Sequence, residues 1–146
     1  MISAILAIVV LVLIVALVVA VARDPGPPAE DVAVAYEDAW DRLDFEALWS
    51  LSGDELRDGM GRRDFVAAKR AAYQRQPQLG GLATQVVVEH LDVGKHAAVV
   101  RTRVDVREGG VARNEVQLEH RAGRWVVVAY HLLGSDGAPP NGALAR

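Results

Sequence analysis

The sequence predicts an α+β protein in which an N-terminal transmembrane helix precedes helices packed on a curved four-stranded antiparallel sheet. Three observations support this prediction. Ile2 to Ala22 is an apolar run without a charged residue, residues 30–76 carry apolar side chains at helical spacing, and apolar and polar residues alternate after Gly81. The change in hydrophobic period, from about 3.6 to about 2 residues, divides the chain into a helical part and a strand part.

The first element, residues 1–23, has the length of a membrane span. A helix over Ile2 to Ala22 would be about 30 Å long, which matches the hydrocarbon core of a bilayer. Residues 20–22 have the small-x-small form of a signal-peptidase site, but the run lacks a positive n-region and is too long for a signal peptide. We therefore expect an uncleaved anchor and a single-pass cell-membrane protein. Arg23 alone favours a cytoplasmic domain, so the side of the membrane stays undetermined.

Composition limits the remaining chain to one small domain. The protein has 146 residues, so about 120 remain after the anchor, enough for a single hydrophobic core. Cysteine is absent, which excludes disulfides, thiolate metal sites and cysteine nucleophiles. The net charge of −3 combines an acidic part, residues 24–58, with a basic part, residues 59–146. A nucleic-acid partner is not expected, because such a domain would be basic overall, with aromatic residues among the bases.

Three helices are expected before the sheet. Residues 24–29 are rich in proline and glycine, which block helix formation and predict a linker. Amphipathic patterns predict helices over residues 30–43, 45–51 and 64–76. Asp44 and Asp64 are the expected N-caps of the second and third of these helices. Ser52 and Glu55 have the spacing of a capping box, which predicts one further helical turn to about Asp58.

Four strands are expected over residues 83–92, 96–107, 111–121 and 124–133. The short turns between them predict an antiparallel meander. The alternation places Thr102 and Asn114 on the inner face, and carrying it through the last turn places His131 opposite Asn114. Arg103 and Glu115 are expected to pair on the outer face. Residues 134–146 have the composition of turns and predict a disordered tail.

The order of these elements resembles the nuclear transport factor 2-like superfamily of cone-shaped α+β domains, in particular its small bacterial membrane-anchored members. The segments that resemble it are Ala-Trp-Asp-Arg-Leu-Asp-Phe-Glu-Ala-Leu in the helical part and Gly-Arg-Trp-Val-Val in the last strand. The resemblance spans residues 30–133. It implies a pocket between helices and sheet in the isomerase-like and dehydratase-like members, and binding or dimerisation in many others. Residues 51–63 are too short and glycine-rich for the hairpin that enzyme members often carry, and no position matches their deep catalytic aspartate.

Eight residues are expected to line the mouth of the cone and contact a ligand: Tyr36, Trp40, Tyr73, Thr102, Asn114, His120, Trp125 and His131. No catalytic residue is assigned, because a histidine base needs an orienting carboxylate and none is evident on the inner face. No metal or cofactor is expected, since the four histidines lack paired ligand spacing.

Two function hypotheses stay open. The first is a membrane-anchored, non-enzymatic binding domain for a protein partner, for a second copy of itself through the sheet, or for a small apolar ligand. The alternative is a pocket enzyme, an isomerase, dehydratase or hydrolase that acts on a hydrophobic small molecule. A buried carboxylate or histidine with a strongly shifted pKa facing a pocket would favour the enzyme, and a cone filled by Trp40, Tyr73 and Trp125 would exclude it. A weaker third hypothesis is that the basic stretch around residues 62–75 contacts anionic lipid.

Overall fold

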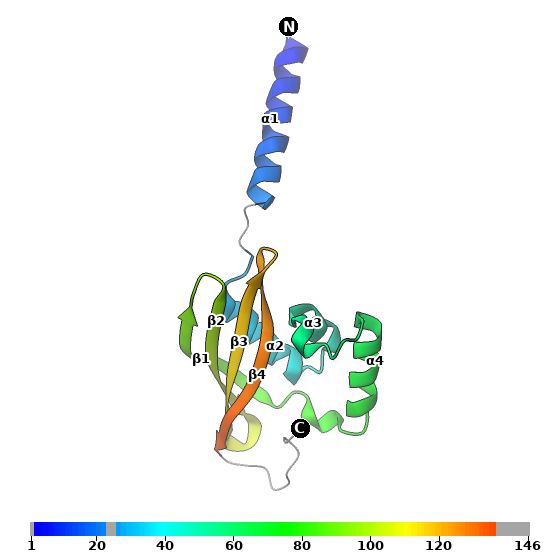
Figure 1. The fold of residues 1–146 in the computed structure, drawn as a ribbon, viewed down its shortest axis with the longest axis vertical. Coiled ribbons are helices and arrows are strands. Elements are labelled where there is room, and N and C mark those ends of the chain that lie inside the picture. The colour runs from blue at the N-terminus through cyan, green and yellow to red at the C-terminus, as the bar shows by residue number, and fades with distance from the viewer. Residues whose placement is uncertain (1, 23–25, 137–146) are drawn as a thin grey trace.

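The computed structural model describes residues 2–22 and 26–136. Its helices are α1 (Ile2–Ala22), α2 (Ala29–Asp41), α3 (Phe45–Leu51) and α4 (Arg62–Tyr73), and short 3-10 turns cover Asp54–Leu56, Pro77–Leu79 and Arg107–Gly109. Its strands are β1 (Ala83–Val93), β2 (Ala97–Val106), β3 (Gly110–Arg121) and β4 (Arg124–Asp136). They form one antiparallel sheet in the order β1-β2-β3-β4. The α+β class and the four-stranded meander are therefore as the sequence predicts (Figure 1).

Helix α1 lies apart from the sheet in Figure 1. The side chains of Leu6 and of residues 9–19 in this helix are exposed. Within the part of the chain that the structure describes, no helix combines the length and the apolar character required to cross a membrane. This finding contradicts the predicted transmembrane helix over Ile2–Ala22 and the single-pass localisation based on it.

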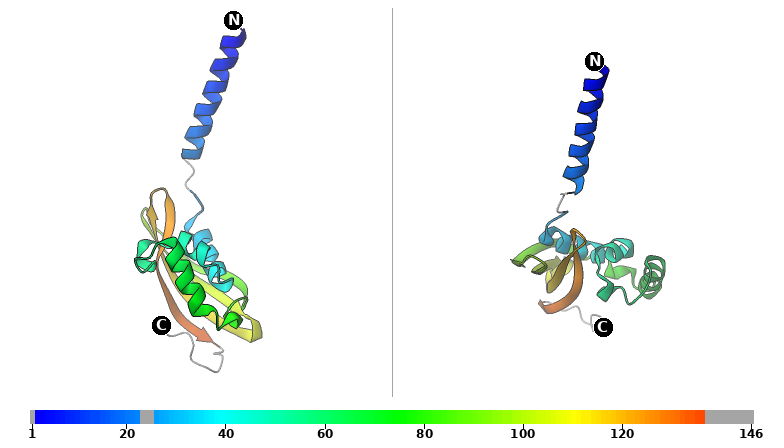
Figure 2. Two further views of the ribbon diagram at one scale, coloured as in Figure 1. Left: turned by 90° about the vertical axis from the view of Figure 1, so that its right-hand side faces the viewer. Right: turned by 45° about the horizontal axis from the view of Figure 1, so that its top comes forward.

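Helix α2 covers one face of the curved sheet, and α3 and α4 follow to the side of it, with α4 packed on α3 (Figure 2). Helix α2 packs against the sheet through a buried stripe that includes Val32, Ala33 and Tyr36. It ends at Asp41 rather than at residue 43, because Leu43 adopts a left-handed backbone with φ of 52° that cannot continue a helix. The predicted linker, residues 24–29, falls partly outside the described residues, and Ala29 already belongs to α2.

The predicted helix caps are confirmed only in part. The side chain of Asp44 accepts a hydrogen bond of 3.0 Å from the backbone N–H of Ala47, as expected of an N-cap. Asp64 is not a cap, since α4 begins at Arg62 and places Asp64 in its first turn, where a negative charge suits the helix dipole. The capping box at Ser52 is also wrong, because the Ser52 hydroxyl donates to the backbone carbonyl of Leu48 at 2.7 Å.

The sheet register differs from the prediction at one critical point. Gln117 of β3 lies opposite Ala129 of β4, but the next residue, Leu118, lies opposite Val127, so Val128 is an extra residue in β4. Such a bulge reverses the faces of the side chains that follow, here up to Leu132, after which a second register shift leaves Leu133 as another extra residue. Tyr130 consequently points to the inner face, where His131 was expected.

Two other details of the sheet also depart from the prediction. Glu115 pairs with Arg101, which lies directly opposite it at 3.1 Å, and not with Arg103. Strand β4 continues to Asp136, so residues 134–136 belong to the sheet and not to the predicted tail. Residues 137–146 of that tail lie outside the described part of the chain.

Candidate functional site

A buried carboxylate lies at the centre of the interface between α2 and the sheet. Glu37 is only 5% exposed. Its Oε1 accepts hydrogen bonds from Thr102 Oγ1 at 2.5 Å and from Asn114 Nδ2 at 3.0 Å. Its Oε2 accepts a hydrogen bond of 2.8 Å from the hydroxyl of Tyr130. We call these four residues the Glu37 cluster; it joins α2 to β2, β3 and β4.

The local structure explains how the cluster forms. Glu37 lies one helical turn after the fully buried Ala33, so it belongs to the buried stripe of α2. Thr102 and Asn114 lie directly opposite each other on β2 and β3, with both side chains buried beneath that stripe. Tyr130 completes the set because the bulge at Val128 turns it inward.

Burial changes the acidity of the cluster. Burial raises the pKa of Glu37, and the hydrogen bonds from Thr102, Tyr130 and Asn114 oppose this effect only in part. Burial also raises the pKa of Tyr130, and the adjacent negative charge of Glu37 raises it further. The phenol of Tyr130 therefore remains a hydrogen-bond donor, and the carboxyl group of Glu37 holds its proton more tightly than an exposed glutamate does.

The raised pKa of Glu37 predicts that stability falls as pH rises. Below the ordinary glutamate pKa of about 4.3, the carboxyl group is protonated in both the folded and the unfolded chain. Above it the unfolded chain ionises first, so the free energy of unfolding decreases, by at most about 1.4 kcal/mol per pH unit, until pH passes the folded pKa. Chemical denaturation between about pH 4.5 and 8 should show this decrease in the wild type relative to Glu37→Gln. Parallel pH profiles of the two proteins would contradict the assignment.

An aromatic cluster fills the space between the three helices. Tyr36 and Trp40 of α2, Phe45 of α3 and Tyr73 of α4 have ring centroids between 5.5 and 6.5 Å apart in successive contacts. Tyr36 also lies 5.4 Å from the ring of Tyr130, which connects this cluster to the Glu37 cluster. The inside of the cone is thus occupied by protein side chains from α4 through to β4.

The structure brings together some of the eight predicted ligand-contacting residues and separates others. Tyr36, Trp40 and Tyr73 share the aromatic cluster, and Thr102 and Asn114 share the Glu37 cluster. His120 and Trp125 contact each other, with ring centroids 5.0 Å apart, near the turn between β3 and β4. His131 is exposed on the outer face opposite Glu115, and not beside Asn114 as expected. Their roles as ligand contacts stay predictions.

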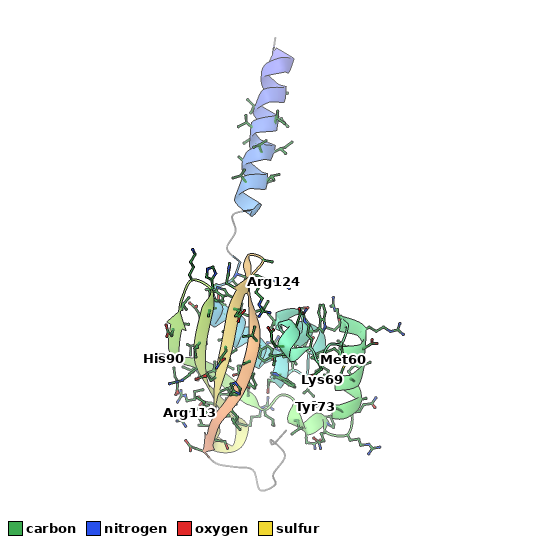
Figure 3. All side chains as sticks on the ribbon, in the orientation of Figure 1. Met60, Lys69, Tyr73, His90, Arg113 and Arg124 are labelled. Atoms are coloured by element: carbon green, nitrogen blue, oxygen red, sulfur yellow. The ribbon has the colours of Figure 1, made fainter. Side chains whose placement is uncertain are left out.

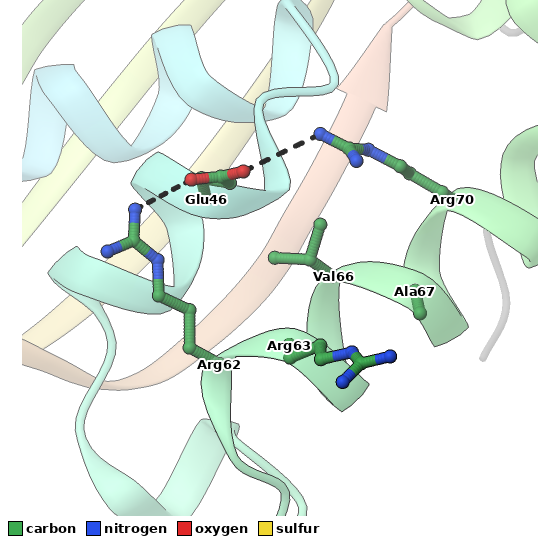
Figure 4. Close-up of a pocket in the computed structure, with 6 residues that line it drawn as sticks. All are labelled: Glu46, Arg62, Arg63, Val66, Ala67 and Arg70. Atoms are coloured by element: carbon green, nitrogen blue, oxygen red, sulfur yellow. Dashed lines mark hydrogen bonds and ion pairs between the residues drawn. The ribbon is translucent and has the colours of Figure 1, made fainter.

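A groove lies outside the cone, between α3 and α4. It has a volume of about 450 Å³ and is lined by Glu46, Arg62, Arg63, Val66, Ala67 and Arg70. Glu46 Oε2 lies 2.6 Å from Arg62 Nη2, and its Oε1 lies 3.7 Å from Arg70 Nη2, so one carboxylate lies between two guanidinium groups (Figure 4). The sequence predicts these arginines as a basic stretch, but their spacing carries no link to Glu46, which belongs to a different helix.

Residues that could hold a metal ion lie apart from one another. Within residues 2–22 and 26–136, no three histidine, aspartate or glutamate side chains gather as ligands. His90 lies on the edge strand β1, on the opposite side of the molecule from Tyr73 on α4 (Figure 3).

Comparison with solved structures places this arrangement in a known fold. A Campylobacter jejuni protein provisionally assigned as an NTF2-like transpeptidase is similar over 69% of this chain and 97% of its own, with a TM-score of 0.50 and 19% identity. An NTF2-like protein of unknown function from Shewanella oneidensis MR-1 is similar over 70% of this chain and 93% of its own, with a TM-score of 0.51 and 22% identity. The chain has the nuclear transport factor 2-like fold.

The NTF2-like fold supports a binding or pocket domain in general, without specifying a partner or ligand. No family model and no curated protein sequence matches this chain. At these identities the likeness establishes the fold alone, so function has to be argued from the Glu37 cluster and the α3–α4 groove.

Proposed function

We propose that this NTF2-like domain is a non-enzymatic binding domain for a small ligand, a protein partner or a second copy of itself. The observation that supports the proposal is the occupied interior of the cone. Both oxygens of Glu37 already accept hydrogen bonds, and aromatic rings fill the space between the helices. A reacting substrate would have to displace these contacts, whereas a ligand or partner on the surface leaves them in place.

Native mass spectrometry of the full chain, purified without added ligand, tests this proposal. We expect either a retained mass that dissociates on denaturation or a stoichiometric oligomer. The same preparation is then incubated with the released compound, and a binding domain should leave the mass of that compound unchanged. A bare monomer that retains no mass and forms no oligomer at any accessible concentration would contradict the proposal.

The pocket-enzyme hypothesis remains the second candidate, because burial raises the pKa of Glu37, a shift in the direction that general acids and bases use. It is a buried carboxylate with a raised pKa, next to a tyrosine hydroxyl at 2.8 Å. An isomerase, dehydratase or hydrolase acting on a hydrophobic molecule would use such a group after local opening. Conversion of the released compound by the wild type, and its absence in Glu37→Gln at equal folded fraction, would favour the enzyme over the binding domain.

A further inference from the structure

The α3–α4 groove has a regular construction along α4. Arg62, Val66 and Arg70 follow one another at a spacing of four residues, so they form one row on the helix surface, and Arg63 and Ala67 form the next row. Val66 is 6% exposed because it packs towards α3. The groove thus has an apolar floor with an arginine from each end of this row, and the backbone positions of the two arginines are about 12 Å apart along the helix axis.

The charges in the groove are not balanced. Its lining includes three arginines and one glutamate, Glu46, which contacts Arg62 and Arg70. Arg63 makes no ion pair with any residue that the structure describes, and in Figure 4 its guanidinium points away from Glu46. Two positive charges in the lining therefore have no carboxylate of their own.

The arginines of the sheet differ in this respect. Four of them lie within 4.0 Å of at least one carboxylate: Arg101, Arg103, Arg113 and Arg121 contact Glu55, Glu89, Asp105, Glu115, Glu119 and Asp136 between them. Arg124, at the first position of β4, makes no ion pair with any residue that the structure describes. Around the four paired arginines, the outer face of the sheet is neutralised by its own acids. In the groove, by contrast, three arginines share one glutamate.

Glu46 shows how an anion would be held. Its carboxylate lies between two guanidinium groups, the geometry in which arginine binds carboxylates and phosphates. The side chains of Glu46, Arg62 and Arg70 are between 49% and 65% exposed, so water screens these pairs and an external anion displaces Glu46 at small cost.

From these observations we infer that the α3–α4 groove binds a small organic anion, a carboxylate or phosphate attached to a short apolar group, and that Glu46 competes with this anion for Arg70. The apolar group would contact Val66 and Ala67, and the anion would contact Arg63 and Arg70. The volume of about 450 Å³ lies in the range of ordinary small-molecule sites. The inference rests on the proposed binding function and specifies its site and ligand class.

Titration of the full chain with hexyl phosphate and with hexanoate, followed by calorimetry and amide NMR shifts, tests the inference. We expect Arg63→Gln and Arg70→Gln each to weaken binding about fivefold, the value of one exposed ion pair. Arg75→Gln is the matched control, because it removes the same charge from an exposed position just after α4 that does not line the groove. It should change affinity less than twofold. Glu46→Gln should tighten binding, because it removes the competing carboxylate.

The outcomes separate this inference from the proposed function. If Arg63→Gln and Arg75→Gln weakened probe binding equally, net charge alone would attract the probe, and the groove would not be the binding site. The inference would also be wrong if neither probe bound, or if Glu46→Gln failed to tighten the binding of either probe. If the double variant Arg63→Gln/Arg70→Gln still retains the copurifying mass, the domain binds a ligand elsewhere and only the groove is rejected. If the chain bound vesicles that contain anionic phospholipid but bound neither soluble probe, the ligand would be a lipid headgroup and not a free anion.

Discussion

Glu37→Ala is expected to lower the free energy of unfolding by roughly 3–5 kcal/mol. The substitution removes the acceptor shared by Thr102, Asn114 and Tyr130, and leaves their donors facing a cavity between α2 and the sheet. Thr102 is fully buried and Asn114 is 4% exposed, so water reaches them poorly. Denaturation of the chain by urea or guanidinium chloride at neutral pH measures the loss.

Two control variants separate the hydrogen bonds from the general effect of losing an acid. Glu37→Gln keeps the shape and one carbonyl acceptor for Thr102 and Asn114, and its amide can donate to the Tyr130 hydroxyl, which also accepts. We expect it to cost about 1 kcal/mol at neutral pH. Asp38→Ala, on the solvent side of the same helix, should change stability by about 0.5 kcal/mol or less. Similar losses in Glu37→Ala and Asp38→Ala would show that the cluster does not hold α2 on the sheet.

The spacing of apolar and polar residues along the chain was sufficient to predict most of the fold. The inner residues of β2 and β3 alternate with charged ones, so Thr102 and Asn114 were placed correctly on the buried face. Asp44 follows an apolar stripe and precedes another, which is enough to identify it as a cap. Each of these features depends on residues close together in the chain, where the sequence carries the information directly.

The bulge in β4 could not be predicted in the same way. Val126, Val127 and Val128 are consecutive and equally apolar, so no alternation marks which of them is the extra residue. The pairing with β3 decides this, together with the connection after α3, whose Gly53 N–H donates to the carbonyl of Val127 at 2.7 Å. The error in the position of His131 and the failure to expect Tyr130 at the site both follow from that one residue.

Glu37 was missed for a related reason. No inward carboxylate is evident from the strand alternation, although Glu37 lies one turn after Ala33 and beside Tyr36, both on the buried stripe of α2. That spacing was the available signal, but a charged residue next to apolar ones usually turns to solvent. Its burial is explained only by the donors that β2, β3 and β4 supply, and these are far away in sequence.

The second large effect is expected for Phe45→Ala, which should cost about 3–5 kcal/mol. Phe45 is 4% exposed, and its ring lies 6.4 Å from Trp40 of α2 and 5.5 Å from Tyr73 of α4. Removing the ring leaves a cavity where the three helices meet. Helix α4 packs mainly on α3, so it should lose protection before the sheet does.

Amide hydrogen exchange of the chain measures this order directly. In Phe45→Ala, the amides of α4 should exchange faster by a larger factor than those of β2 and β3, because α4 depends on the aromatic cluster whereas the strands pair with one another. Tyr73→Phe is the control, since it keeps the ring contacts with Trp40 and Phe45 and should change stability by less than about 1 kcal/mol. Because the α3–α4 groove lies beside this packing, Phe45→Ala should also weaken anion binding without changing any groove charge. Uniform acceleration across helices and strands would instead mean that α4 and the sheet unfold as one unit.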